Sequence, residues 1–133
     1  MALVVPDVGE ALLLSYALGK ITAGATVKLK LYTNDYTPVE GSTYKLFTEA
    51  TAAGYAAIDL AKASWTIATD TGVTTATYAQ QTETFTAAST NYGYYITDIA
   101  GTGLLWAERF SDAPHTIPSG GGTEKITVNL IGE

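Results

Sequence analysis

The chain has 133 residues, of which 47% are hydrophobic, so it can bury one core and is not an intrinsically disordered protein. Thirteen acidic against seven basic residues give a net charge of −6, which argues against nucleic-acid binding, because phosphate contacts need clustered lysine and arginine. The absence of cysteine excludes disulfides, thiol catalysis and cysteine-ligated metal sites.

Residues 6–19 carry the clearest helix pattern in the chain. Asp7 is suited to the N-cap, Glu10 stands three residues later, and Gly19 is suited to end the helix. We expect its apolar face to be buried, either on a sheet or against a neighbouring subunit. That face consists of Leu12, Leu13, Tyr16 and Ala17, widened by Leu14 and Leu18.

The next segments predict a strand followed by a long loop. Residues 27–33 alternate cleanly, which points Val27, Leu29 and Leu31 inward and leaves Lys28 and Lys30 in solvent. Asn-Asp and Pro38 then break the strand. Residues 39–54 lack a sustained period and predict a loop with one helical turn, of a length that is usually functional or interface-forming.

From residue 55 onward the pattern is strand after strand. The segment 92–110 holds two aromatic-rich runs around a turn at 98–103, which predicts a hairpin from the middle of a sheet. The other expected strands are 55–60, 64–69, 73–78, 81–86 and 124–131, with a link at 87–91 and a long connection at 111–122. We therefore expect an all-β fold, a jelly-roll-like antiparallel β-sandwich of seven or eight strands with one short N-terminal helix.

No linker or internal repeat divides the sequence, so residues 1–133 are expected to form one domain, with 1–22 as an N-terminal helix or arm. The N-terminal run lacks the basic region that precedes the apolar run of a signal peptide, and no stretch is long enough to span a bilayer. We expect a soluble protein made in a cytoplasm, without a membrane partner.

The single histidine is the best candidate for catalysis. A Ser-His-Asp relay would combine His115 with Ser111 or Ser119 as nucleophile and Asp112 as orienting acid. Neither serine lies in a nucleophile-elbow motif, and a lone histidine in a proline-flanked loop is usually an exposed polar residue. We therefore prefer the interpretation that His115 is an exposed polar residue with no catalytic role.

Glu108 is the most interesting acid. Strict alternation places it on one face with Leu104, Trp106 and Phe110, which would surround a carboxylate with apolar groups. It is either a functional acid or, as we prefer, a structural acid paired with a neighbour such as Arg109 or lying in a subunit contact.

Metal and phosphate sites have weak support. Asp70 and Asp98 each precede a glycine, as is ordinary in turns, and neither has the successive oxygen donors of a calcium loop. The glycines at 120–122 lack the Lys-Ser/Thr of a phosphate-binding loop. We expect no catalytic, cofactor-binding or metal residues and no cofactor.

Clustered aromatics raise the possibility of carbohydrate binding. Tyr92, Tyr94, Tyr95 and Trp106 lie in the hairpin at 92–110. Alternation places Tyr92 and Tyr94 on one face and Tyr95 on the other, so they form no single stacking platform. Aromatics in a central hairpin more often belong to a core or a subunit contact.

As a series, several short motifs resemble small structural proteins encoded among the head genes of tailed phages, most closely capsid decoration (cement) proteins. They are VPDVGE (5–10), LYTNDYTP (31–38), FTEA (47–50), GYA (54–56), YAQQ (78–81), TFT (84–86), GYYITD (93–98) and LWAERF (105–110). The resemblance supplies no catalytic residues.

This resemblance implies a non-enzymatic virion protein on the capsid surface whose partner is the major capsid protein. It also implies a homo-oligomer, with a trimer favoured because it suits the local three-fold axes of a capsid lattice. A head-fibre or tail-associated host-attachment module is the alternative, and a hydrolase that depends on His115 is the third hypothesis.

Overall fold

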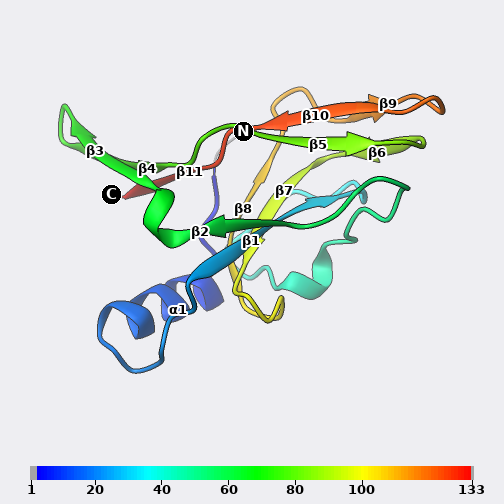
Figure 1. The fold of residues 1–133 in the computed structure, drawn as a ribbon. Coiled ribbons are helices and arrows are strands. Elements are labelled where there is room, and N and C mark those ends of the chain that lie inside the picture. Colours follow the sequence, from blue (N-terminus) through cyan, green and yellow to red (C-terminus); the bar gives the residue numbers. More distant parts are fainter. Residues whose placement is uncertain (1–2, 133) are drawn as a thin grey trace.

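The computed structural model describes residues 3–132, which form one α-helix, two short 3₁₀ helices and eleven strands (Figure 1). In chain order these are α1 (Asp7–Ala17), β1 (Thr26–Tyr32), η1 (Tyr44–Leu46), β2 (Ile58–Ala61), η2 (Lys62–Ser64), β3 (Thr66–Asp70), β4 (Val73–Thr77), β5 (Gln81–Phe85), β6 (Ser89–Asn91), β7 (Gly93–Thr97), β8 (Leu104–Arg109), β9 (His115–Ile117), β10 (Gly122–Ile126) and β11 (Asn129–Gly132).

The first layer is a four-stranded antiparallel sheet with the order β2-β1-β7-β8. Its strands alternate as the sequence predicts: Val27, Leu29 and Leu31 are buried on one face. Lys28 forms an ion pair with Asp59. Lys30 is less exposed than expected, because its ammonium group contacts Glu49 at 3.2 Å.

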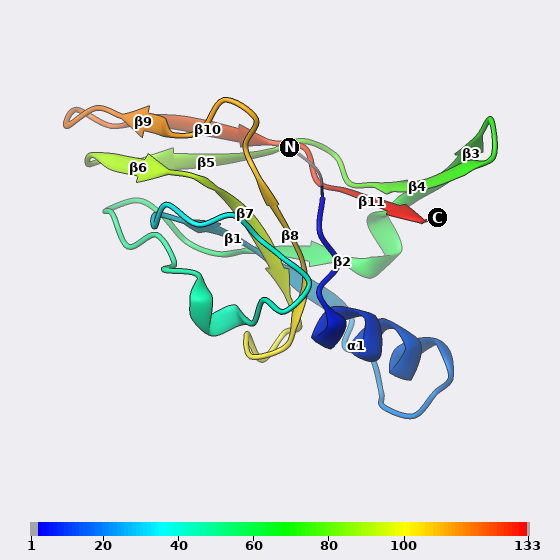
Figure 2. The same ribbon diagram turned by 180° about the vertical axis from the view of Figure 1, so that it is seen from behind.

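The second layer is a long ribbon that lies over this sheet (Figures 1 and 2). One run of chain supplies β4, β5 and β6, and the returning run supplies β9, β10 and β11, so that β6 pairs with β9, β5 with β10 and β4 with β11. β3 adds a third strand beside β4 at one end. The ribbon therefore extends past the first sheet on the side where α1 lies.

The main core fills the space between the two layers. Leu29, Leu31 and Ile96 from the first sheet belong to one buried cluster with Phe85 and Ile126 from the ribbon. A smaller aromatic cluster lies on the other face of the first sheet, where Tyr32, Tyr95 and Phe47 are in ring contact; the 34–48 segment covers that face.

These arrangements confirm the all-β sandwich class with one N-terminal helix; the jelly-roll order is not confirmed. The hairpin at 92–110 is present, but only β7 lies inside its sheet, since β8 is the last strand in the order. The 39–54 loop contains the expected single helical turn, η1.

The expected strand count was too low, because short strands lie in segments assigned to connections. β6 occupies part of the 87–91 link, and β9 and the start of β10 lie in the 111–122 connection. The single strand expected at 124–131 is two strands, β10 and β11, separated by residues 127–128.

The helix is confirmed with two corrections. Its N-cap is Pro6, and Asp7 lies in the first turn and does not cap it. Gly19 ends the helix as expected, with φ 66° and the paired bonds of a Schellman motif, in which Gly19 N–H reaches Tyr16 O and Lys20 N–H reaches Ser15 O. The face expected to be buried is only partly so, since Leu14 and Leu18 are 62% and 71% exposed.

Candidate functional site

β3, β4 and β11 form a three-stranded sheet, here called the projecting sheet, that has no second sheet against it in the described residues (Figure 2). Every residue of β3 is exposed. Apolar side chains are uncovered on both faces: Ile67 on one, and Val73 and Ile131 on the other. Apolar side chains that are uncovered in this way gain stability when a partner buries them.

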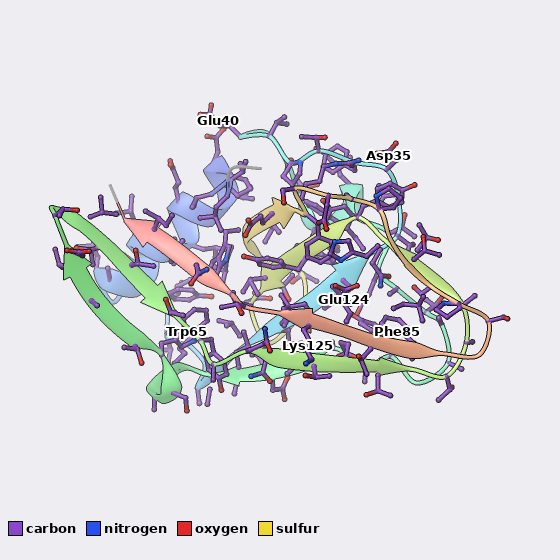
Figure 3. All side chains as sticks on the ribbon, turned by 90° about the horizontal axis from the view of Figure 1, so that it is seen from above. Asp35, Glu40, Trp65, Phe85, Glu124 and Lys125 are labelled. Atoms are coloured by element: carbon purple, nitrogen blue, oxygen red, sulfur yellow. The ribbon has the colours of Figure 1, made fainter. Side chains whose placement is uncertain are left out.

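Between the projecting sheet and α1 lies an apolar groove of about 230 Å³. Its lining comes from α1, η2, the four-stranded sheet, the projecting sheet and the residue that precedes β3. The lining residues are Leu13, Tyr16, Val27, Lys62, Trp65, Ile67, Ala76, Leu105, Trp106 and Leu130. Trp65 lies near the start of β3 (Figure 3) and meets the rings of Trp106 and Tyr78 edge-on, which fixes one wall of the groove.

Charge is sparse around this groove. Asp70 is the one charged residue in β3, β4 and β11. The one cation of the lining, Lys62, lies over the ring of Tyr16 at 4.7 Å. Cores of protein–protein interfaces are similarly depleted in charge, so the groove and the exposed apolar residues beside it have the composition of a protein-binding surface.

His115 lies in β9, so the expectation of an exposed loop residue was wrong. Its ring stacks on Phe110 with centroids 4.3 Å apart. Nε2 lies 2.6 Å from Asp112 and Nδ1 lies 2.7 Å from Glu124. Partial burial lowers the pKa of His115, but the hydrogen bonds and charges of the two carboxylates outweigh it, so the pKa is raised.

This geometry does not form the Ser-His-Asp relay considered from the sequence. Both ring nitrogens of His115 are engaged by carboxylates, so neither is directed at Ser111 or Ser119. A general base needs one nitrogen within reach of the nucleophile's proton. The two carboxylates therefore favour the protonated form of the His115 imidazole.

Besides His115, Glu124 has an acidic neighbour that the sequence analysis did not single out. Glu124 and Glu83 are directly paired across β10 and β5, and both are buried. Burial raises the pKa of Glu83, against a weak hydrogen bond from the Ala56 N–H. Alternation offered the signal, since Glu83 shares a face with Phe85 and Glu124 with Ile126.

Glu108 is a paired acid, but its partner differs from the one expected. It accepts a hydrogen bond from the Tyr94 hydroxyl at 2.7 Å, whereas Arg109 pairs with Asp35. Burial, then Glu108, raises the pKa of Tyr94. A shift in the register of β7 with β8, between Ile96 and Thr97, places Leu104 in the smaller aromatic cluster. Leu104 therefore does not share a face with Glu108.

The hairpin aromatics do not form a sugar-binding platform. Tyr94, Tyr95 and Trp106 are at most 4% exposed and belong to the two cores. Tyr92 packs against the smaller aromatic cluster and does not lie on the face of Tyr94, as alternation had predicted. Tyr92 precedes β7, so the alternation of that strand does not extend to it.

The turn residues do what the sequence predicted. Asp98 Oδ1 accepts hydrogen bonds from the backbone N–H groups of Thr102 and Gly103. Asp70 flanks the two-residue turn between β3 and β4. Gly121 has φ 88° in the turn that precedes β10. In the described residues no three His, Asp or Glu side chains are placed to hold a metal ion.

Among residues 3–132, no helix has both the length and the apolar character needed to cross a membrane. Comparison with known proteins found no similar protein-family model, no similar curated protein and no similar solved structure.

Proposed function

We propose that this chain is a capsid decoration (cement) protein of a tailed phage, which binds the assembled head through the major capsid protein. The observation that supports this most is the charge-poor surface formed by the projecting sheet and the apolar groove, together with the exposed Leu14 and Leu18 of α1. The motif series in the sequence supplies the phage context.

A cement protein needs exposed surface that becomes buried on the shell and a rigid body behind it. Here the sandwich core provides the rigid body, and Leu14, Leu18 and Ile67 provide exposed apolar area. Leu14 belongs to α1, Leu18 follows it directly and Ile67 belongs to β3, and these two elements lie at the same end of the molecule (Figure 1). A protein that binds only the assembled shell stabilises that shell by mass action. No chemistry at the site is required.

The test uses expanded heads assembled without this chain, mixed with the purified protein. We expect stoichiometric cosedimentation and greater resistance of the heads to heat. Leu14→Asp and Leu18→Asp place charges on the outer side of α1 and should abolish binding while leaving the fold intact. Leu46→Asp is the matched control, since Leu46 is 46% exposed on η1 and does not line the apolar groove.

Absence of binding by the wild-type chain, or equal binding by the α1 variants and the control, would reject the proposal. The host-attachment alternative has no comparable support, because three of the four hairpin aromatics that suggested it, Tyr94, Tyr95 and Trp106, are buried.

A further inference from the structure

The outer edge of β3 is unpaired in the described part of the chain. β3 pairs with β4 on one side, and no described strand pairs with its other side. Edge strands in stable monomers are usually blunted by lysine, proline, a bulge or a covering loop. Residues 66–70, Thr-Ile-Ala-Thr-Asp, contain neither lysine nor proline. The ladder with β4 is regular, so β3 has no bulge.

The turn that ends β3 determines which backbone groups are open. Thr71 and Gly72 have φ of 48° and 83°, as in a type I′ turn, so Asp70 and Val73 form the hydrogen-bonded pair beside it. Hydrogen-bonded and non-hydrogen-bonded pairs alternate along an antiparallel ladder. The N–H and C=O groups of Ile67 and Thr69 therefore point away from β4, toward the open edge.

We propose that β3 pairs with β3 of a second copy of this chain, antiparallel and centred on Ala68. In that register Ile67 opposes Thr69 of the second copy, and both pairs exchange the backbone bonds that the turn leaves open. Ala68 meets its own symmetry mate as a close, non-hydrogen-bonded pair, where a small side chain fits. The two projecting sheets become one six-stranded sheet.

A second copy matches this edge because the open backbone groups of β3 are complementary to themselves in this register. Each chain carries −6, so two copies repel each other overall, but acidic groups are sparse at this edge and the local repulsion is small. Asp70 is the one charged residue of the projecting sheet, and the proposed register places it opposite Thr66, with the two aspartates at opposite ends of the contact. A basic partner would find only Asp70 to pair with along this edge.

The contact has two-fold symmetry, so it gives a dimer where the family resemblance led us to expect a trimer. It uses the edge of β3, whereas the capsid proposal uses the faces of the projecting sheet, the groove and α1, and it concerns two copies of this chain alone. The experiments below therefore contain no phage heads, and their failure would leave the head-binding assay unaffected.

The decisive test is oxidative crosslinking of two single-cysteine variants, which the absence of native cysteine makes unambiguous. Ala68→Cys places two thiols on Cα atoms about 4.5 Å apart in the proposed pair, within disulfide range. Thr66→Cys, on the same face of the same strand, leaves its symmetry mates about 14 Å apart. We expect rapid disulfide dimers from the first variant alone; equal crosslinking of both, or of neither, overturns the register.

A charge series measures the same contact without crosslinking. Ala68→Lys opposes two ammonium groups and should weaken dimerisation about fivefold. Thr66→Lys makes the same change in net charge but faces Asp70 of the partner, so it should leave dimerisation intact or strengthen it. Sedimentation velocity gives the association constants, and circular dichroism checks folding. Equal effects of the two lysines overturn the proposal.

Discussion

Glu83 and Glu124 oppose each other on the inner face of the β5–β10 ribbon, with exposed fractions of only 5% and 6%. Like charges directly opposite on one face of a sheet are destabilising, and burial adds a desolvation cost. Two features offset this: the imidazole of His115 binds Glu124, and the pKa of Glu83 is raised by burial, so it holds its proton to higher pH.

This cluster predicts a stability maximum at mildly acidic pH. His115 and Glu83 have raised pKa values in the folded state, so their contributions are complete below their unfolded values of 6.5 and 4.5 and are lost as pH rises through the folded values. The pKa of Asp112 is lowered by its bond to His115, so its contribution is present above 3.8 and is lost at lower pH. We expect the largest free energy of unfolding between about pH 4 and 6.

Urea denaturation at half-unit steps from pH 3.5 to 9 measures this profile. A free energy of unfolding that rises from pH 6 to 8 would show that the cluster does not control the pH dependence.

Removing one carboxylate should stabilise the protein at high pH. Glu83→Gln keeps an acceptor for the Ala56 N–H but removes the charge that faces Glu124. We expect a gain of about 1 kcal/mol in the free energy of unfolding at pH 8, and less at pH 4, where Glu83 of the wild type is protonated. Glu40→Gln is the control, since Glu40 is an exposed acid. An equal response of the two variants would contradict the account.

Local pattern was sufficient for the elements that bury one face. The alternation of Val27, Leu29 and Leu31 predicted β1, and the aromatic runs around the turn at 98–103 predicted β7 and β8. These segments carry their own periodicity, so no knowledge of the partner strand is needed.

The missed elements depend on contacts between distant segments. β6 and β9 are three residues each and largely polar, and each is a strand only because the other pairs with it. The same holds for the site. Alternation points Glu83 and Glu124 inward. Their position opposite each other, however, follows only from the register of β5 with β10. The uncovered edge of β3 likewise depends on the order of the whole sheet.

The single histidine makes its protonation directly measurable by NMR. We expect the imidazole of His115 to titrate with a midpoint above 6.5, because Asp112 and Glu124 stabilise the charged form more than burial opposes it. Asp112→Asn and Glu124→Gln should each lower the midpoint, while Glu40→Gln should leave it unchanged. A wild-type midpoint at or below 6.5, or one that neither substitution moves, would disprove the paired geometry.

We expect Gly9→Ala to destabilise the protein, although replacing a helical glycine by alanine is usually stabilising. Replacing glycine by alanine inside a helix usually gains about 1 kcal/mol. In α1, however, Gly9 is buried against β8, and a methyl group there would overlap the carbonyl oxygen of Leu105 and lie 2.8 Å from its carbon. The obstacle is backbone, so α1 must shift away from the sheet, and we expect Gly9→Ala to lose about 2 kcal/mol of stability.

Gly41→Ala is the matched control, since a methyl group there meets no atom within 4 Å. Thermal and urea unfolding of the two variants give the comparison. Because α1 forms one side of the apolar groove, Gly9→Ala should also change the fluorescence of Trp65 and Trp106, which line it. A stabilised Gly9→Ala protein with unchanged tryptophan emission would mean that α1 does not pack on β8 this closely.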